Sequence, residues 1–367
     1  MMTHLCDLDN EWESFLNTSS ASASASAAPP ALAKRTAVAP PSTDIYISTQ
    51  TKIVYLNQPV DLKAVFWNIP VMSFDEQKEG VLKKQMKFNS LTPEELADIQ
   101  DHLKDEPHYE EYVLTSINNP EGRIKFKDIR KVSVGRRSKD MVPHRGKQKS
   151  AFYNCFVLIF RMETPVDTPP SILKEYHVKV FNTGKLEIPG IQQSCMLPLL
   201  VERVVATLRP WVGETLSAQA GVDGHAIRSE TVLINSNFHC GFTLHREHLY
   251  DILKTEYHIP TIYDPCSYPG IQCKFAYRRT DEGRPVAVTP GTETDTTLDA
   301  KKGISTLSFM IFRTGSVLIV GKCDEDALRM TYETLKEILV REYPRIVVEN
   351  VSDEEMRDKY TPSTKKK

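Results

Sequence analysis

Two ten-residue stretches decide the fold of this chain: FNTGKLEIPG at Phe181–Gly190 and FRTGSVLIVG at Phe312–Gly321. Both fit the pattern Phe-x-Thr-Gly-x-(Leu/Val)-x-Ile-x-Gly, and the second begins 131 residues after the first. The same offset holds in the adjoining helical sequence, where Leu197, Val201, Val204 and Leu208 match Leu328, Tyr332, Leu335 and Leu339. A shared strand, turn, strand and helix predicts a duplicated unit. Two copies favour a pseudo-symmetric binding surface, which suits a two-fold or extended partner.

The duplication sets the expected domain boundaries. Each copy opens with a period-two strand and a short amphipathic helix, at Ile45–Thr51 and Leu62–Phe66 and again at Val232–Asn237 and Leu249–Leu253. These openings lie about 184 residues apart, so the first copy holds about 53 extra residues. We expect a first repeat at 44–213 with an inserted segment at about 88–150, and a second repeat at 230–345 with a loop at about 281–302. A last helix should run from Asp324 to about Glu342, before a C-terminal tail at 346–367.

Composition favours a soluble intracellular protein. The 367 residues carry a net charge of −2 and are 40% hydrophobic, enough for a sizeable core. No apolar run reaches the ~18 residues of a membrane span, and the N-terminus lacks a secretory pattern. Seven scattered cysteines without a C-x-x-C pair argue against a disulfide framework. Residues 1–43 are rich in Ser, Ala and Pro, so we expect a disordered tail, in which Asp7–Leu16 is either a mobile acidic end or a partner-docking helix.

The expected insertion is strongly polarised in charge. Residues 94–111 contain eight acidic residues and a single basic one, Lys104. Residues 121–150 contain eleven Lys and Arg residues against three acidic ones. Such a run forms either a solvated surface or a set of phosphate contacts, because clustered cations release counterions from nucleic acid. The sequence leaves both interpretations open.

Motifs for catalysis are missing from the sequence, which contains no Gly-x-Ser-x-Gly, no Walker loop and no Gly-x-Gly-x-x-Gly. Several His and Cys residues lie close together in sequence: His239, Cys240, His245, His248, Cys266 and Cys273. Their spacing does not match a zinc site, and His245 with His248 fits a solvent-facing pair on a helix. We therefore expect no catalytic residues, no cofactor, no metal and no small-molecule substrate.

Taken together, these motifs resemble the TATA-box-binding protein family. The second copy is the better match, through Leu233–Asn235, Tyr268–Ile271, Ile311–Gly315 and Gly321 before the last helix. In the first copy the likeness rests on Ile47–Thr49, Asp61–Lys63 and Val180–Lys185. It spans about residues 44–345, and its closest form is the divergent version encoded by large DNA viruses. The resemblance implies an α+β fold, a curved antiparallel sheet forming a pseudo-two-fold saddle, with helices on the convex side and DNA under the concave side.

The resemblance also assigns aromatic wedges, which unstack a base step and kink the duplex from its minor groove. Phe181 and Phe312 fall on wedge positions in the two hairpins, and Tyr268 falls on a third. Each residue also has an ordinary interpretation, because a strand Phe can pack against a helix and Tyr268 can be a turn residue. The position of these rings relative to the core distinguishes the two.

The fourth wedge position has two candidates. Chain order, with Glu79–Val81 set against Pro269–Ile271, places Lys78 there, and a lysine cannot intercalate. Matching Tyr153–Phe160 to Tyr268–Phe275 instead supplies Tyr153.

Alternation along a strand predicts which side chains share a face with each wedge. In the second copy they form a small, mostly apolar set suited to a groove floor: Met310, Thr314, Ser316, Leu318 and Val320. In the first copy they are more polar: Lys179, Thr183, Lys185, Glu187 and Pro189. We expect Glu187 to point toward phosphates, which departs from the family.

The central and flanking positions of the expected surface are polar. The family's paired Asn and Thr are represented by Asn235, which could also be a plain edge residue, and by Thr51 as a substituted position. Lys274 and Lys84 are candidate phosphate contacts, which position a protein on DNA without specifying sequence.

The sequence thus predicts a non-enzymatic transcription-initiation factor that binds double-stranded DNA in an A·T-rich minor groove. Such a factor bends the DNA and recruits general transcription factors or RNA polymerase subunits, in the nucleus or at a cytoplasmic viral replication site, away from membranes. One alternative is an interaction scaffold that keeps the fold but has lost groove binding. Another is a non-specific DNA or RNA binder that uses residues 121–150.

Overall fold

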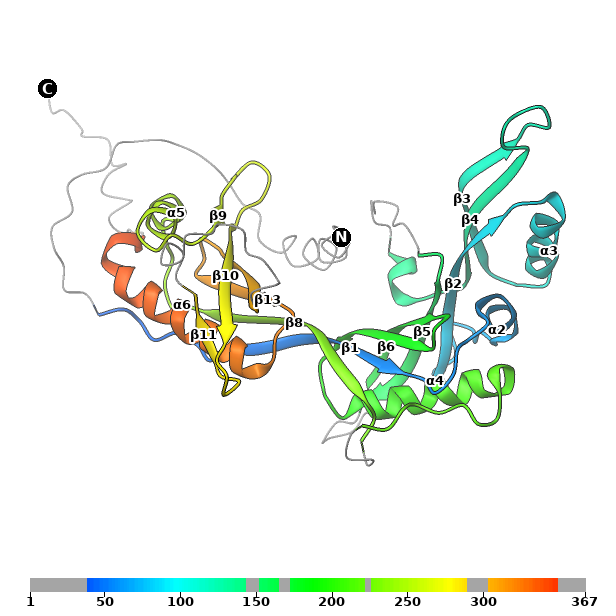
Figure 1. Ribbon diagram of the computed structural model, residues 1–367, viewed down its shortest axis with the longest axis horizontal. Helices are drawn as coiled ribbons and strands as arrows, with labels where there is room; N and C mark the ends of the chain where they lie inside the picture. Colours follow the sequence, from blue (N-terminus) through cyan, green and yellow to red (C-terminus); the bar gives the residue numbers. More distant parts are fainter. Residues whose placement is uncertain (1–37, 143–151, 165–171, 222–225, 289–302, 349–367) are drawn as a thin grey trace, which may run out of the picture. The chain divides into compact units, whose positions relative to one another are not determined.

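The structure is a computed structural model that describes residues 38–142, 152–164, 172–221, 226–288 and 303–348 (Figure 1). The expectations for the tail at 1–37, for the basic residues at 145–149, for most of the loop at 281–302 and for the C-terminal tail beyond 348 lie outside these ranges. We call residues 46–212 the first half and residues 229–346 the second half.

Strands dominate the first half. They are β1 (Tyr46–Tyr55), β2 (Gly80–Ser90), β3 (Tyr109–Asn118), β4 (Phe126–Gly135), β5 (Cys155–Thr164), β6 (Ile172–Phe181) and β7 (Lys185–Ile191). The helices are α2 (Leu62–Asn68), α3 (Pro93–Lys104) and α4 (Met196–Val212), with a 3-10 turn η1 (Ser138–Met141).

The second half is smaller. Its strands are β8 (Ser229–His239), β9 (Thr261–Ile262), β10 (Ile271–Arg279), β11 (Pro285–Ala287), β12 (Ile304–Ile311) and β13 (Ser316–Gly321). Its helices are α5 (Arg246–Thr255) and α6 (Glu325–Ile346). None of the helices within the described ranges has the length and apolar content that crossing a bilayer requires.

Among the described residues, the strands join into a single 13-stranded sheet in the order β11-β10-β12-β13-β8-β1-β7-β6-β5-β2-β4-β3, with β9 paired to β10. The pairings are antiparallel, so the expected α+β class with an antiparallel sheet is confirmed. The halves meet where β1 pairs with β8. From that junction outward, the order β1-β7-β6-β5 mirrors the order β8-β13-β12-β10.

The helices begin where the sequence places good caps. Asp61 accepts hydrogen bonds from the backbone N–H groups of Lys63 and Ala64 at the start of α2, and Asp324 accepts one from Ala327 at 3.0 Å at the start of α6. The predicted end of α6 near Glu342 is wrong, because the helix continues through Pro344 to Ile346. A proline this close to the end removes a single N–H, and the buried Ile346 side chain holds the last turn against the core.

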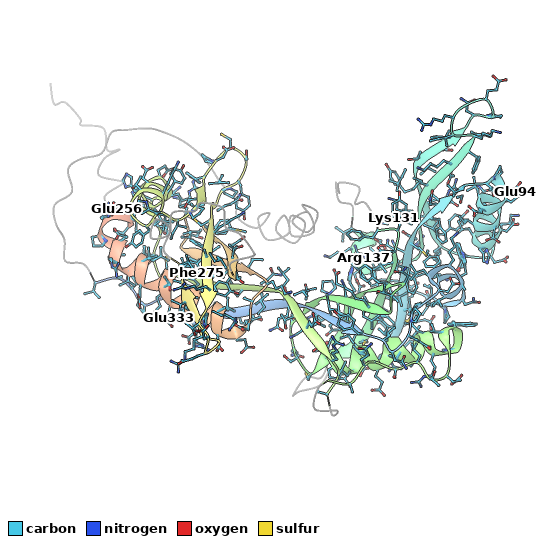
Figure 2. The ribbon with its side chains drawn as sticks, in the orientation of Figure 1. Glu94, Lys131, Arg137, Glu256, Phe275 and Glu333 are labelled. Carbon is cyan, nitrogen blue, oxygen red and sulfur yellow. The ribbon has the colours of Figure 1, made fainter. Side chains whose placement is uncertain are left out.

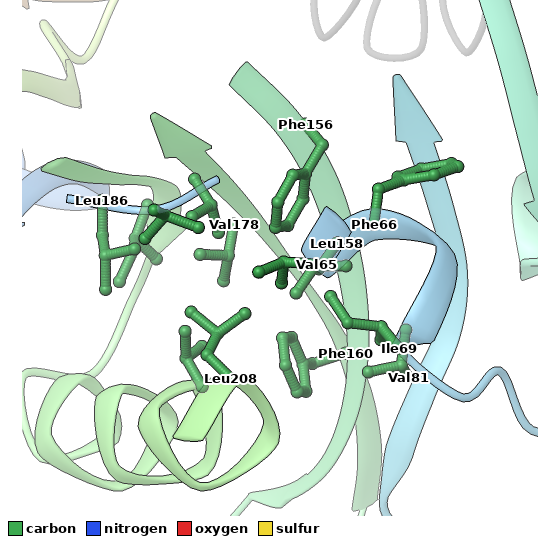
Figure 3. Packing of buried hydrophobic residues seen from close by; sticks show 14 of the residues in the cluster. Val65, Phe66, Ile69, Val81, Phe156, Leu158, Phe160, Val178, Leu186 and Leu208 are labelled. Atoms are coloured by element: carbon green, nitrogen blue, oxygen red, sulfur yellow. The ribbon is translucent and has the colours of Figure 1, made fainter. Parts of the chain in front are cut away.

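Two hydrophobic cores lie on the helix side of the sheet, one in each half, and they share no residue. In the first core, Val65 and Phe66 of α2 and Leu208 of α4 pack onto the inward residues of β5 and β6 (Figure 3). Fully burying one such side chain stabilises the fold by about 1.5–3 kcal/mol relative to exposure. Strand residues in the cores alternate with residues that point away. We call the face that points away from both cores the outer face.

The segment expected as an insertion, 88–150, joins the first half through its described part. Strands β4 and β3 extend the sheet beyond β2, and α3 places Ile99 and Leu103 in the first core. Its opposite charges partly pair with each other, since Arg130 binds Asp128 at 2.6 Å and Glu111 at 2.5 Å. Arg130 is only 6% exposed and therefore belongs to neither a solvated surface nor a phosphate site.

Candidate nucleic-acid interface

Phe181 and Phe312 lie outside both cores. Their sequence neighbours Val180 and Ile311 are at most 1% exposed and belong to the cores, whereas the two Phe side chains are partly exposed on the outer face. The alternative in which these rings pack against a helix is therefore wrong. A role for them in DNA binding stays a prediction.

In the second half, Tyr268 and Phe312 form an aromatic pair. Their ring centroids are 6.0 Å apart and meet edge to face at 62°. Both rings close over Gly270, where a Cβ atom would lie 2.9 Å from Cε1 of Tyr268 and 3.0 Å from Cε1 of Phe312. Only glycine allows this approach without displacing a ring. The Tyr268 hydroxyl reaches the Met310 sulfur at 3.6 Å, so the pair continues into an apolar neighbour on the same face.

The strand beside this pair presents the predicted groove-floor residues. Along β13 the core residues Val317 and Ile319 alternate with Ser316, Leu318 and Val320 on the outer face. Val320 is only 5% exposed, since it lies between Ser308 and Asn235 in the ladder.

The β12–β13 turn holds Thr314, which is exposed. Its hydroxyl donates to the Ser316 hydroxyl at 3.2 Å. The turn thus places a small polar edge beside the aromatic pair.

In the first half the strand register favours Tyr153 over Lys78 as the counterpart of Tyr268. Cys155 on β5 pairs with Phe181 on β6. On β10, Ile271 pairs with Ile311, so the next position, Gly270, faces Phe312. Cys155 therefore occupies the place of Gly270, and Tyr153 the place of Tyr268, two residues earlier. Lys78 instead forms an exposed ion pair with Glu76.

Lysines cover both aromatic rings of the first half. The Lys185 ammonium lies 4.8 Å from the ring centroid of Phe181, and the Lys87 ammonium lies 3.8 Å from that of Tyr153. Each contact is a cation–π interaction, stronger where water is excluded. A positively charged side chain therefore lies beside each exposed ring of the first half.

Glu187 does not point freely toward a ligand, as the sequence suggested. Its carboxylate accepts a hydrogen bond from the Lys179 ammonium at 2.8 Å, and both side chains are mostly buried on the outer face. Antiparallel pairing of β6 with β7 sets Lys179 directly opposite Glu187, which explains the contact. Thr183 remains exposed in the turn after Phe181, and Pro189 is partly exposed.

The centre of the surface contains Asn235 and a residue that the sequence reasoning missed, Thr49. The Asn235 amide donates to the Thr49 hydroxyl at 2.9 Å, while its carbonyl oxygen is buried without a protein partner. Thr51, the predicted counterpart, pairs with Leu233 instead. In the β1–β8 pairing the residue opposite Asn235 is Thr49, two positions from the Thr51 that the 184-residue offset gives, so an offset alone could not find Thr49.

The two predicted phosphate lysines differ in position. Lys274 on β10 is exposed and available to a ligand. The prediction for Lys84 is wrong, because its ammonium is buried against the carbonyls of Trp67 and Ile69 at 3.1 and 2.9 Å. Burial lowers the pKa of Lys84, and the nearby Glu106 opposes that shift.

Part of the outer face of the first half is covered by η1 and the residues around it. Three contacts hold this segment on β2 and β6: Asp140 to Lys83 at 2.8 Å, the Ser138 N–H to Glu175 at 2.9 Å, and Arg137 to His177 at 2.8 Å. Figure 2 labels Arg137 beside these strands. The second half has no comparable cover within its described residues.

The His and Cys residues near the start of the second half do not assemble into a site. Over the described ranges, no group of three or more His, Cys, Asp or Glu side chains is placed to hold a metal ion. The rings of His245 and His248 lie 5.2 Å apart. Cys273 is buried, and burial raises the pKa of its thiol to about 12, so this group is a neutral core residue.

Comparisons with known proteins find similarity in structure but not in sequence. Searches by sequence against protein families and curated proteins find no match. Among solved structures, the fold is similar to that of Methanococcus jannaschii TBP, with 11% sequence identity, a TM-score of 0.39, and coverage of 82% of this chain and 99% of that chain. A likeness of this size decides neither the family nor the function of the chain.

Proposed function

We propose that this protein is a non-enzymatic, minor-groove DNA-binding factor built from two repeats, 44–213 and 230–345, that form a pseudo-two-fold saddle. It inserts Phe312 and Tyr268 at one end of its site and Phe181 and Tyr153 at the other. The supporting observation is that these rings lie on the outer face, at equivalent places in the strand ladders of the two halves.

The proposed mechanism rests on the chemistry of the minor groove. The minor groove lets a protein distinguish A·T from G·C pairs but little else. A sheet therefore recognises its sequence by the shape of the groove and the deformability of the duplex. Ser316, Leu318 and Val320 supply a small, smooth surface for the groove floor, and Thr49 with Asn235 supplies hydrogen-bonding groups at the centre. The buried, unpartnered carbonyl oxygen of Asn235 suits a donor that a ligand brings.

The proposed role in the cell is transcription initiation, with the helices facing general transcription factors or RNA polymerase subunits. The proposed place of action is the nucleus or a cytoplasmic viral replication site. A preference for A·T-rich sequence is part of this proposal.

The test is a band-shift and circular-permutation bending assay on A·T-rich and G·C-rich duplexes with Phe181→Ala/Phe312→Ala. We expect the double variant to lose bending and most of its affinity, because the wedges disappear while the sheet stays intact. The matched control is Leu199→Ala/Val340→Ala, which removes two exposed apolar side chains from α4 and α6. Equal bending by the wild type and the wedge variant contradicts the proposal.

A second candidate, an interaction scaffold without groove binding, is favoured by one observation. The η1 segment occupies outer-face positions on β2 and β6 and reduces the surface that a duplex could reach in the first half. A scaffold predicts that the wild type neither bends A·T-rich DNA nor distinguishes it from G·C-rich DNA. The non-specific binder predicts instead that charge reversal within 121–150 abolishes binding while the wedge variant behaves as the wild type.

A further inference from the structure

The last strand of the first half's sheet, β3, pairs along one edge only among the described residues. It stands at the end of the sheet order, and its pairing strand is β4. Figure 1 shows β3 and β4 as a hairpin that extends beyond β2. The second edge of a terminal strand presents a row of backbone N–H and C=O groups that a further strand can bind.

This strand also exposes apolar side chains. Four of them are between 39% and 48% exposed: Tyr109, Tyr112, Val113 and Leu114. Natural edge strands are commonly protected by Lys or Pro, and Tyr109–Asn118 contains neither. A bulge between Val113 and Thr115 interrupts the ladder in the middle of the strand. A strand that covered this edge would remove apolar surface from water and so stabilise the complex.

Charge is distributed unevenly along the hairpin. At one end, α3 and the start of β3 form what we call the acidic base, residues 94–111, with eight acidic residues against Lys104. Figure 2 labels Glu94 on α3. At the other end, the β3–β4 turn at 119–125 carries the exposed cations Arg123 and Lys125 against Glu121. We call this turn the basic tip.

This polarity favours a second copy of the chain as the occupant of the edge. In an antiparallel pair of β3 strands related by a two-fold axis, the basic tip of each copy lies beside the acidic base of the other. Opposite charges then meet at both ends, whereas a parallel pair brings like charges together. A uniformly basic peptide would match the acidic base but would be repelled by the basic tip.

We propose that two copies of this chain dimerise through antiparallel pairing of their β3 strands, so that the two sheets join across the two-fold axis. The apolar side chains near the middle of β3 are buried at this junction, and the acidic base and basic tip fix its orientation. Each copy uses the same edge, so the assembly closes at the dimer. This inference goes beyond the proposed function and does not depend on it, because the aromatic rings take no part.

Sedimentation velocity of the full chain over a concentration series measures the association, and we expect a monomer–dimer equilibrium. Leu114→Lys should leave only the monomer, because two ammonium groups then meet close to the two-fold axis. Leu114 lies in the bulge, so the new charge has no opposing residue in the β3–β4 ladder. The matched control is Ile262→Lys, at an exposed apolar residue of β9, which should dimerise as the wild type does.

A charge swap tests the orientation. One variant reverses the acidic base at four exposed residues: Asp98→Lys, Asp101→Lys, Asp105→Lys and Glu110→Lys. It keeps Glu106 and Glu111, whose carboxylates pair with Lys84 and Arg130 inside the first half. Circular dichroism checks that this variant and the others are folded.

The second variant, Arg123→Glu/Lys125→Glu, reverses the basic tip. Each charge variant alone should be monomeric, because like charges meet at both ends of its own dimer. An equimolar mixture should form the heterodimer, because opposite charges then meet at both ends again. A monomeric wild type, a dimer that persists in Leu114→Lys, or a mixture that associates no better than its components overturns the inference. Binding of a lysine-rich peptide by a monomeric wild type would overturn it too, and would assign the edge to a basic partner.

Discussion

The two halves place aromatic rings at equivalent positions on the same face, yet surround them with different chemistry. In the second half, Tyr268 and Phe312 pack on each other over Gly270. In the first half, Phe181 and Tyr153 are each covered by a lysine. The matching strand order of the two halves therefore fixes where a ring lies, whereas the neighbouring side chains decide whether the ring favours an apolar surface or an anion.

The difference originates in the strands that lie at the outer edge of each half. In the second half the sheet continues beyond β10 only with the short strand β11 among the described residues, and the outer face combines Leu318 and Val320 of β13 with the exposed Lys274 of β10. In the first half, β4 adds Lys131 to the outer face, and the η1 segment ties Asp140 to Lys83. We infer that the second half is the stronger wedge and the first half the stronger electrostatic contact.

The largest expected effect is a loss of stability when the second core alone is changed. Phe309→Ala empties a fully buried site in the second core and should destabilise the protein by about 3–5 kcal/mol. Circular dichroism in a denaturant series measures this loss. Trp67 and Trp211 both lie in the first half. The unfolding midpoint followed by tryptophan fluorescence should therefore shift less than the midpoint followed by circular dichroism. Coincident shifts would mean that the halves unfold as one unit.

The next largest effect is a difference in DNA affinity between substitutions at Phe312 and at Phe181. Phe312→Ala should weaken binding to an A·T-rich duplex by about 1–3 kcal/mol, the scale of one aromatic–base stack. Phe181→Ala should cost less, because Lys185 beside this ring retains its attraction for phosphates. Titrations of the two single variants measure the difference. A larger loss for Phe181→Ala would reverse the assignment of roles to the halves.

Local patterns in the sequence were sufficient to predict which residues form much of the outer face. The ten-residue repeat placed Phe181 at the end of a strand and Phe312 directly after one, and alternation correctly put Ser316, Leu318 and Val320 on the face opposite the core. Such predictions work because the side-chain period of a regular strand is fixed by the backbone.

Irregular and distant features could not be predicted in this way. A bulge between Val81 and Lys83 changes which residues of β2 face the core, and so it turns Lys84 inward. The partner of Glu187 depended on the β6–β7 register, and that of Asn235 on the pairing of β1 with β8. Each requires two strands to be aligned in space, which a single-sequence pattern does not specify.

A pH experiment tests whether the second core is the more sensitive to alkali. Burial raises the pKa of both Cys273 and Cys323 to about 12, and that of Cys155 in the first half to about 11. A raised folded-state pKa gives stability that is complete below the unfolded value near 9 and is lost as the pH rises toward the folded value. At pH 10, ionisation of the Cys273 thiol in the unfolded chain should lower the free energy of unfolding by about 1.4 kcal/mol.

Cys273→Ala measures that contribution. The variant carries a constant penalty for the lost volume, but its unfolding free energy should fall less steeply between pH 8.5 and 10 than that of the wild type, by about 1.2 kcal/mol over the interval. Cys266→Ala is the matched control, because this thiol is exposed. Parallel pH profiles for all three proteins would show that the Cys273 thiol titrates normally.

The smallest effect concerns the ion pair that distinguishes the first-half face. Glu187→Gln removes the carboxylate that binds Lys179 at 2.8 Å and leaves the strand register unchanged. If this face contacts phosphates, the released charge should add up to one contact and steepen the dependence of log K on log salt by about 0.9. Affinity for A·T-rich duplexes at low salt should rise by less than about 1 kcal/mol, because the lysine keeps much of its present position. A reduced slope would mean that Glu187 positions the side chains of this face and does not merely neutralise Lys179. Lys179 would then not count among the charges that make the first half the stronger electrostatic contact.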